Sequence, residues 1–228
     1  MISILIPVYN TPKSFLLECF SSIENQTFRD YEVIIINNDS DKQETNEVLE
    51  NYSRKDKFFV FDCPKEKGKR GISCALNFGL QKCTHEYVAR MDSDDIMLPE
   101  RLQKQISYMS LNPKVDICGT QMFNMNTKKI MTNHEMVIEK EKYKVSDWFL
   151  NHPTVMFKKT KILNIGGYPE TPEYAPEDFL LWTKALKNDF IIHNMQDSLI
   201  YYRVHGENLS GKDQKHADWK KAMEECRK

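Results

Sequence analysis

The chain has no long apolar stretch and no excess of charge of either sign. None of its 228 residues falls in a run of 18 uninterrupted apolar residues, and the first apolar run, at residues 2–8, is too short for a signal sequence and lacks a basic lead. Lys and Arg total 32 against 33 Asp and Glu, which indicates neither nucleic acid nor an anionic membrane as the main partner. We therefore expect a soluble, cytoplasmic protein without a membrane span.

Paired cysteines, internal repeats and low-complexity linkers are also missing. The six cysteines are scattered, with no C-x-x-C pair and no histidine at zinc-ligand spacing. This pattern indicates free thiols in a reducing compartment, with disulfides in a secreted form as the alternative. The length fits one domain with a substantial core, although two small domains are also compatible with it.

What the sequence does contain is a regular alternation of apolar strands and amphipathic helices. Residues 2–8 are typical of a strand buried on both faces, and Pro12 stands at the first position of a predicted helix. Similar strands are expected at 32–36, 58–61 and 86–89, each followed by a helical pattern. The order predicts an α/β fold with a mostly parallel, Rossmann-like twisted sheet and helices on both faces.

Polar clusters follow three of these strands, at Tyr9–Asn10, at residues 37–41 and at residues 92–95. Ligands of doubly wound sheets bind beyond the carboxyl ends of the strands, so we expect the three clusters to line one crevice. In the third cluster, alternation of side chains places Asp92 and Asp94 on the same side, where two hard oxygen ligands suit Mg²⁺ or Mn²⁺. The alternative is a solvated acidic turn before the next helix.

The second half is expected to be less regular. Acidic Glu177 and Asp178 open a helix whose apolar face includes Trp182. Acidic residues at a helix N-terminus are favoured by the macrodipole, so a purely structural role is an equal alternative. The other expected elements are strands at 115–123, 151–157 and 198–204, a polar surface excursion at 124–143, and a charged C-terminal helix or tail at 211–228.

Five stretches match one family in order and spacing. They lie at residues 4–10, 71–79, 90–95, 177–182 and 202–205. Together they resemble an inverting glycosyltransferase of family 2 with the GT-A fold, over residues 2 to about 210. The resemblance implies one GT-A domain at 1–210, with a nucleotide-binding half at 1–98 and an acceptor-binding half at 99–210, before the tail at 211–228.

What the resemblance implies for the site is a nucleotide-sugar donor, a divalent ion and a catalytic base. The base is Asp178, and Mn²⁺ or Mg²⁺ is held by Asp92, Asp94 and His205. The residues expected at the nucleotide sugar are Pro7, Tyr9, Asn10, Asn38, Arg70, Asn77, Asp92 and Ser93. Those expected at the acceptor or in a lid are Tyr168, Glu177 and Trp182. The expected acceptor is a glycan, a lipid-linked sugar or a protein. The lack of a membrane span in the sequence favours addition of one sugar at a time.

One departure from the family pattern concerns the nucleobase. The position where the family usually carries an aspartate pair reads Asn37–Asn38 here, with Asp39 one place later. Asparagine still offers a donor and an acceptor to a pyrimidine edge, so a UDP-sugar is the default expectation.

Several roles keep two interpretations at this stage. Lys69 and Arg70 are candidates for phosphate contacts, and residues 169–176 are a candidate lid, with Tyr168 and Tyr174 as candidate sugar-stacking rings. Three further residues each have two possible roles. His152 either contacts the acceptor or is structural, and Trp182 either contacts a ligand or belongs to the core. Asp95 either lies beside the metal or caps the next helix. A nucleotidyltransferase remains the alternative enzyme, and a non-catalytic sugar-nucleotide-binding module the alternative outside enzymes.

Overall fold

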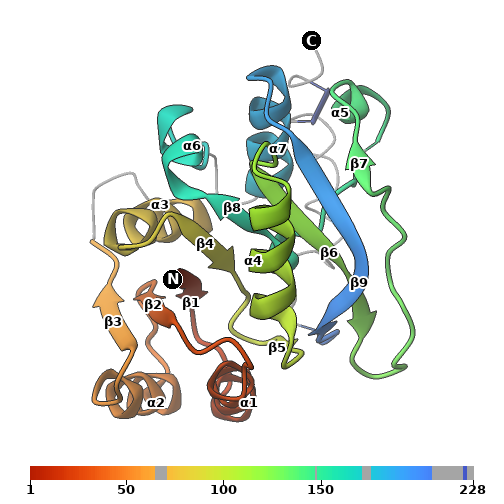
Figure 1. Cartoon of the computed structure of the whole chain (residues 1–228). Coiled ribbons are helices and arrows are strands. Elements are labelled where there is room, and N and C mark those ends of the chain that lie inside the picture. The colour runs from red at the N-terminus through yellow and green to blue at the C-terminus, as the bar shows by residue number, and fades with distance from the viewer. Residues whose placement is uncertain (65–70, 147, 171–175, 207–222, 225–228) are drawn as a thin grey trace.

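The first four strands of the sheet are parallel, as the alternation predicted. The computed structural model describes residues 1–64, 71–146, 148–170, 176–206 and 223–224 (Figure 1). The strands lie in the order β3-β2-β1-β4. Their bounds are β1 (Ile2–Val8), β2 (Tyr31–Asn37), β3 (Phe58–Asp62) and β4 (Tyr87–Arg90). Their carboxyl ends therefore share one edge of the sheet, the edge at which the sequence places its polar clusters.

The second half of the sheet mixes directions. The strand β8 (Met156–Lys158) runs antiparallel between β4 and β6 (Ile117–Asn124), and β9 (Ile192–Tyr202) runs parallel to β6. Two short strands, β5 (Ile96–Met97) and β7 (Val137–Ile138), pair antiparallel with β9. This arrangement brings the end of β9 beside the segment that follows β4.

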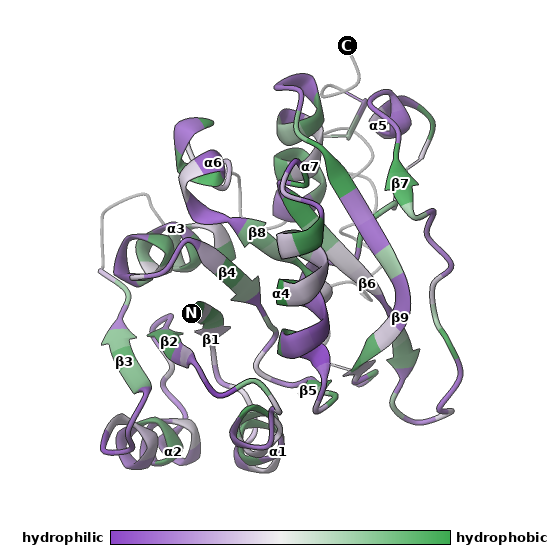
Figure 2. Ribbon diagram, in the orientation of Figure 1, coloured by the Kyte–Doolittle hydropathy of each residue, from purple (hydrophilic) through white to green (hydrophobic). Residues whose placement is uncertain are grey.

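Helices cover both faces of the sheet because apolar side chains of the strands alternate between two cores. In β1, Ile4 and Ile6 pack on the first core and Leu5 on the second. The first core is covered by α1 (Lys13–Glu24), α2 (Gln43–Ser53) and α4 (Arg101–Leu111), and the second by α3 (Ile72–Lys82), α6 (Lys159–Asn164) and α7 (Glu177–Lys187). In Figure 2 the central strands are mostly green and the connecting loops mostly purple, as expected for a sheet buried on both faces.

Helix α3 packs unusually close to the sheet at Gly79. A Cβ built there comes within 2.3 Å of Leu5 Cδ1 and 2.9 Å of Ile36 Cγ1. We expect Gly79→Ala to lower the free energy of unfolding by about 1–3 kcal/mol, because two core side chains have to move. Urea denaturation measures this, with Gly206→Ala as the control, since no atom of the described residues lies within 4 Å of a Cβ there. Equal urea midpoints for Gly79→Ala and Gly206→Ala would contradict the close packing of α3 on the sheet at Gly79.

Two strand predictions need correction. The segment 151–157 is not one strand: a 3-10 turn (His152–Thr154) precedes the short β8, because Pro153 has no N–H to give to a ladder. The last strand starts at Ile192 instead of residue 198. The pairing of β9 with β6 shifts register between Thr120 and Gln121, so polar residues 196–197 form an irregularity within the strand and do not end it.

The surface excursion at 124–143 contains Ile130, which forms a bridge with Phe123 of β6, and the strand β7. A short helix α5 (Lys142–Val145) ends it. Of the predicted tail at 211–228 only residues 223 and 224 are described, so that prediction lies largely outside the described residues. Among the described helices, none has the length and apolar character needed to cross a membrane.

Candidate active site

The acidic cluster lies where β4 ends and the chain turns into β5. One carboxylate oxygen from each of Asp92, Asp94 and Asp95 lies within 4.8 Å of the others. Asp92 and Asp94 are partly exposed, whereas Asp95 is fully buried. The three side chains are close enough to share one cation.

A buried arginine forms an ion pair with the acidic cluster. Arg90 is 1% exposed, and its guanidinium lies 2.5 Å from Asp92 Oδ1. Arg101, also buried, donates to the carbonyl oxygen of Arg90 at 2.7 Å. Burial, with the nearby charge of Arg90, lowers the pKa of Arg101 to about 9. Sequence reasoning missed both arginines as supports, although a basic residue ending an apolar strand was a usable signal.

The end of β9 reaches the same cluster. His205 Nε2 lies 2.8 Å from Asp94 Oδ2, within hydrogen-bonding distance, and contact of His205 with a metal stays a prediction. Arg203 donates its backbone N–H to Asp95 Oδ1 at 2.8 Å and its Nε–H to the carbonyl oxygen of Asp94 at 2.7 Å. Asp95 therefore does not cap the following helix, whose N-cap is Glu100.

The electrostatics of the cluster fit a divalent cation. Burial and then the charge of Asp92 raise the pKa of Asp94, and the same two causes raise that of Asp95 well above its ordinary value. The second carboxylate oxygen of Asp95 has no hydrogen-bond partner among the described residues. Crowded carboxylates of this kind are stabilised by a hard cation with oxygen ligands, so these residues fit Mg²⁺ or Mn²⁺.

Asn10 orders the loop beyond β1 and β2. It has a positive φ of 51°, donates from Nδ2 to Asp41 at 2.7 Å, and accepts from the backbone N–H groups of Asp41 and Lys42. Tyr9 beside it is 61% exposed. A large exposed ring next to an ordered polar loop agrees with the predicted nucleotide side, and contact with a nucleotide stays a prediction.

The other nucleotide-side residues follow the same edge. Ser93 shares a hydrogen bond with Thr11 at 2.6 Å, which ties the acidic cluster to the start of α1. The backbone of Asn38 donates to Val8 at 2.8 Å, and Pro7 lies opposite Ile36 in the ladder. Pro7, Asn38 and Ser93 therefore lie near one edge of the sheet, and their contact with a nucleotide stays a prediction.

Asn77 has a partner within the chain. Its Nδ2 donates to the carbonyl oxygen of Tyr168, and its Oδ1 accepts from the Tyr168 N–H, both at 2.8 Å. The residue therefore fastens α3 to the turn before the predicted lid, and its contact with a nucleotide stays a prediction. The predictions for Lys69, Arg70 and Tyr174 and most of those for the lid lie outside the described residues.

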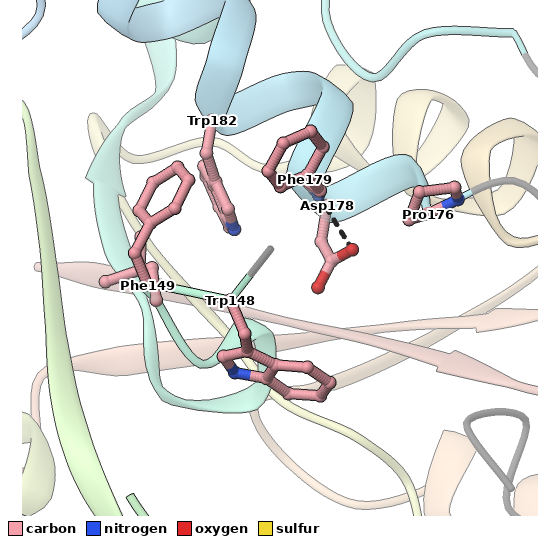
Figure 3. Close-up of a pocket in the computed structure, with 7 residues that line it drawn as sticks. Trp148, Phe149, Pro176, Asp178, Phe179 and Trp182 are labelled. Atoms are coloured by element: carbon pink, nitrogen blue, oxygen red, sulfur yellow. Dashed lines mark hydrogen bonds between the residues drawn. The ribbon is translucent and has the colours of Figure 1, made fainter. Parts of the chain in front are cut away.

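The predicted base stands at the first turn of α7. Asp178 Oδ1 accepts from the backbone N–H of Phe179 at 2.7 Å, and its carboxylate lines a pocket with Trp148 and Trp182 (Figure 3). Burial and then the charge of Glu177 raise the pKa of Asp178. A raised pKa makes a carboxylate a better proton acceptor, provided that it is still ionised at the working pH.

Behind Asp178 lies a buried chain of polar groups. His152 Nε2 lies 2.9 Å from the Tyr168 hydroxyl, and Nδ1 lies 3.4 Å from Glu177 Oε1. Burial, and then the charge of Arg90, lowers the pKa of His152 to about 3, so the ring is neutral. Tyr168 is 1% exposed, which corrects the expectation that its ring stacks on a sugar. The geometry gives His152 a supporting role.

We expect Glu177 to make the stability of the fold depend on pH. Burial raises its pKa from 4.5 to about 7, so between these values the folded chain holds a proton that the unfolded chain has lost, and stability falls as pH rises. Relative to the wild type, we expect the free energy of unfolding of Glu177→Gln to rise by roughly 2–3 kcal/mol between pH 4.5 and pH 8. Urea unfolding at both pH values measures it. The exposed Glu50→Gln is the control, and a pH-independent difference for Glu177→Gln would contradict the assignment.

The fold and the site together define a class of protein. A parallel sheet in the order β3-β2-β1-β4, an Asp-x-Asp cluster after β4 and a carboxylate at the start of a later helix make up a GT-A domain. The family model described as "Glycosyl transferase family 2" matches residues 3–189. The chain belongs to this family, and the match sets aside the nucleotidyltransferase alternative.

Two of the curated relatives carry names that state a reaction or a product. An Escherichia coli UDP-Gal:alpha-D-GlcNAc-diphosphoundecaprenol beta-1,3-galactosyltransferase is 35% identical over 210 residues, 90% of this chain and 74% of that protein. The amylovoran biosynthesis glycosyltransferase AmsE of Erwinia amylovora is 31% identical over 211 residues, 90% of this chain and 76% of that protein.

Solved structures share the fold at lower identity. Staphylococcus aureus TarS in complex with UDP-GlcNAc matches with a TM-score of 0.74 and 23% identity, over 92% of this chain and 61% of that one. The mannosyltransferase PcManGT of Pyrobaculum calidifontis, in complex with GDP-Man and Mn²⁺, matches with a TM-score of 0.75 and 16% identity, over 97% and 62%. This chain thus spans less than two thirds of these solved chains.

Proposed function

We propose that this protein transfers one sugar from a nucleotide-sugar donor, most simply a UDP-sugar, to an acceptor hydroxyl, with a divalent cation and with inversion. The observation that carries the proposal is the position of Arg90. Its guanidinium pairs with Asp92 of the acidic cluster, and its charge also acts on the pKa of both Glu177 and Asp178. The diphosphate side and the base side therefore belong to one electrostatic unit.

The cation would be held by Asp92, Asp94 and His205, with Asp95 behind them. When bound, it supplies a positive charge that stabilises the departing diphosphate. Arg90 pairs with the Asp92 carboxylate and orients it, and Arg203 holds the backbone of Asp94. In this proposal residues 1–98 form the nucleotide half and residues 99–210 the acceptor half.

Asp178 takes the proton from the attacking hydroxyl. The hydroxyl oxygen forms a bond to the anomeric carbon, the bond from that carbon to the diphosphate oxygen breaks, and its electron pair leaves with the diphosphate. Attack from the side opposite the leaving group inverts the anomeric centre in one step. Trp148 and Trp182 beside Asp178 exclude water from the carboxylate, which limits hydrolysis of the donor.

The acceptor that the relatives support is a lipid-linked sugar. The E. coli relative is named for transfer of galactose from UDP-Gal to GlcNAc-diphosphoundecaprenol, and AmsE for the synthesis of amylovoran. We extend this substrate class to the present chain, with a role in polysaccharide biosynthesis.

The experiment that tests the proposal is a thermal-shift screen of UDP-, GDP- and dTDP-sugars with and without Mn²⁺. A ligand that binds only the folded state stabilises it by RT ln(1 + L/Kd), where L is the free ligand concentration, so the melting temperature rises with ligand concentration. We expect a UDP-sugar to stabilise the protein only when Mn²⁺ is present, and the same donor to yield a glycosylated product. No stabilisation by any nucleotide sugar would contradict the proposal, and binding without turnover would instead favour the non-catalytic module.

A further inference from the structure

Two cysteine thiols lie in contact between the end of β3 and the start of α3. The sulfur atoms of Cys63 and Cys74 are 3.7 Å apart, close enough for one thiol to donate a hydrogen bond to the other. Both side chains are partly exposed. The two residues are 11 positions apart in the sequence and belong to no C-x-x-C pair, so only the fold brings them together.

Regular structure holds both thiols in place. Cys63 follows β3 directly, and its backbone N–H donates to the carbonyl oxygen of Asn37 at 2.9 Å. Cys74 lies in the first turn of α3, the helix that packs closely on the sheet at Gly79. The two sulfurs therefore stay within reach of each other. A disulfide needs about 2.05 Å between them, a separation that small shifts of the two side chains and their backbone provide.

The other described cysteines differ from this pair. Cys19, Cys83 and Cys118 are 0–3% exposed. Burial raises the pKa of Cys83 and of Cys118 to about 12, and it raises the pKa of Cys19 well above the ordinary value. Thiol exchange requires a thiolate that a reagent reaches, so these three thiols are inert. Among the residues that the structure describes, the accessible thiols are those of Cys63 and Cys74.

The pair lies beside the polar cluster at residues 37–41. Asn37, which accepts from the Cys63 N–H, also donates from Nδ2 to Asp62 Oδ1 at 2.9 Å and accepts from the backbone N–H of Ser40 at 3.1 Å. The family pattern places the nucleobase at Asn37–Asn38. A displacement of Cys63 is therefore transmitted through one backbone hydrogen bond to the side on which the donor is expected.

We propose that Cys63 and Cys74 form a reversible disulfide by exchange with a low-molecular-weight disulfide such as oxidised glutathione, and that this bond weakens binding of the nucleotide sugar. Drawing the sulfurs together displaces Cys63 and disturbs the hydrogen bond that holds Asn37. The effect on the donor rests on the proposed function, whereas formation of the disulfide does not.

The exchange takes place in two steps. One protein thiolate attacks the small disulfide, forms a mixed disulfide with it and releases one small thiol. The second protein thiolate attacks the protein sulfur of the mixed disulfide and releases the other small thiol. In total, two protein thiols lose two protons and two electrons, and the small disulfide is reduced to two thiols.

The test equilibrates the protein with mixtures of oxidised and reduced glutathione and follows its thiols by alkylation and mass spectrometry. We expect the wild type to lose two hydrogen atoms, with a cross-link that peptide mapping assigns to Cys63 and Cys74 and that dithiothreitol reverses. Titration calorimetry with a UDP-sugar and Mn²⁺ should then give a Kd about 3- to 10-fold higher for the oxidised chain than for the reduced chain, the effect of roughly one weakened hydrogen bond.

Serine variants separate the disulfide from other effects of the oxidant. Cys63→Ser and Cys74→Ser should each stop at one glutathione adduct, and the double variant should bind the donor equally with and without oxidised glutathione. Cys83→Ala is the matched control, because it removes a buried thiol and keeps the accessible pair, so it should respond as the wild type does.

A wild type whose two thiols are still alkylated in the most oxidising mixture, or that stops at glutathione adducts, would overturn the disulfide. A complete disulfide with an unchanged donor Kd would overturn its effect on binding and leave the proposed function standing. A reduced wild type that binds no nucleotide sugar would contradict the proposed function and the effect on the donor with it, and mass spectrometry alone would then decide the disulfide.

Discussion

Replacing Asp94 with alanine is expected to abolish Mn²⁺-dependent donor binding and to slow transfer by on the order of 10³-fold, since a cation held at the diphosphate contributes several kcal/mol. The reason lies in the geometry of the cluster. Asp94 is within 4.8 Å of Asp92 and Asp95 and 2.8 Å from His205, so its removal takes away the central ligand. Titration calorimetry of the donor with and without Mn²⁺ measures binding, and a product assay measures transfer.

Asp189→Ala is the control for Asp94→Ala. Asp189 is a highly exposed carboxylate that pairs with Lys140, away from the acidic cluster. We expect this variant to bind the donor and transfer sugar as the wild type does. Wild-type donor affinity in Asp94→Ala, with the same dependence on Mn²⁺, would remove Asp94 from the metal site.

Asp178→Asn is expected to lower the rate of transfer by roughly 10²- to 10⁴-fold, because the amide cannot accept the hydroxyl proton. Donor binding should persist. Asparagine has nearly the same shape, and its Oδ1 still accepts from the Phe179 N–H, so the first turn of α7 keeps its hydrogen bond. Single-turnover rates give the loss in the chemical step, and the thermal shift with donor and Mn²⁺ gives binding.

The matched control for Asp178→Asn is Asp197→Asn, another carboxylate-to-amide change, at a surface ion pair with Lys104. We expect the control to transfer sugar at the wild-type rate. Turnover of Asp178→Asn at that same rate would show that another group takes the proton.

The first half of the fold was predictable because each unit is local. The apolar run of β1 and the β-branched run of β2 are continuous and buried on both faces, and a short turn leads from β1 into α1 and from β2 into α2. The second half was less predictable, since β5, β7 and β8 have only two or three residues. Strands that short exist because β4, β6 and β9 offer edges, and pairing with an edge is a tertiary event.

In the candidate site, too, some residues were predictable from local sequence and others were not. Motif order in the sequence identified the acidic cluster, His205 and Asp178, and the structure brings His205 to Asp94 across 111 positions of sequence. Trp148 lies in none of the matched stretches, and only the fold shows that it faces Asp178. Arg90 was part of a motif, but its burial and its pairing with Asp92 depend on packing that no local pattern encodes.

The most direct test of the account is the anomeric configuration of the product. The nucleotide sugar that stabilises the protein most is incubated with an acceptor, a GlcNAc-diphosphate that carries a short alkyl chain. The reaction is run with Mn²⁺ or with a chelator, and the anomeric configuration of the new linkage is assigned by proton NMR coupling. We expect an inverted linkage, formed only when Mn²⁺ is present. A retained linkage, or full activity in the chelator, would contradict single-step transfer from a donor held through the cation at Asp92 and Asp94.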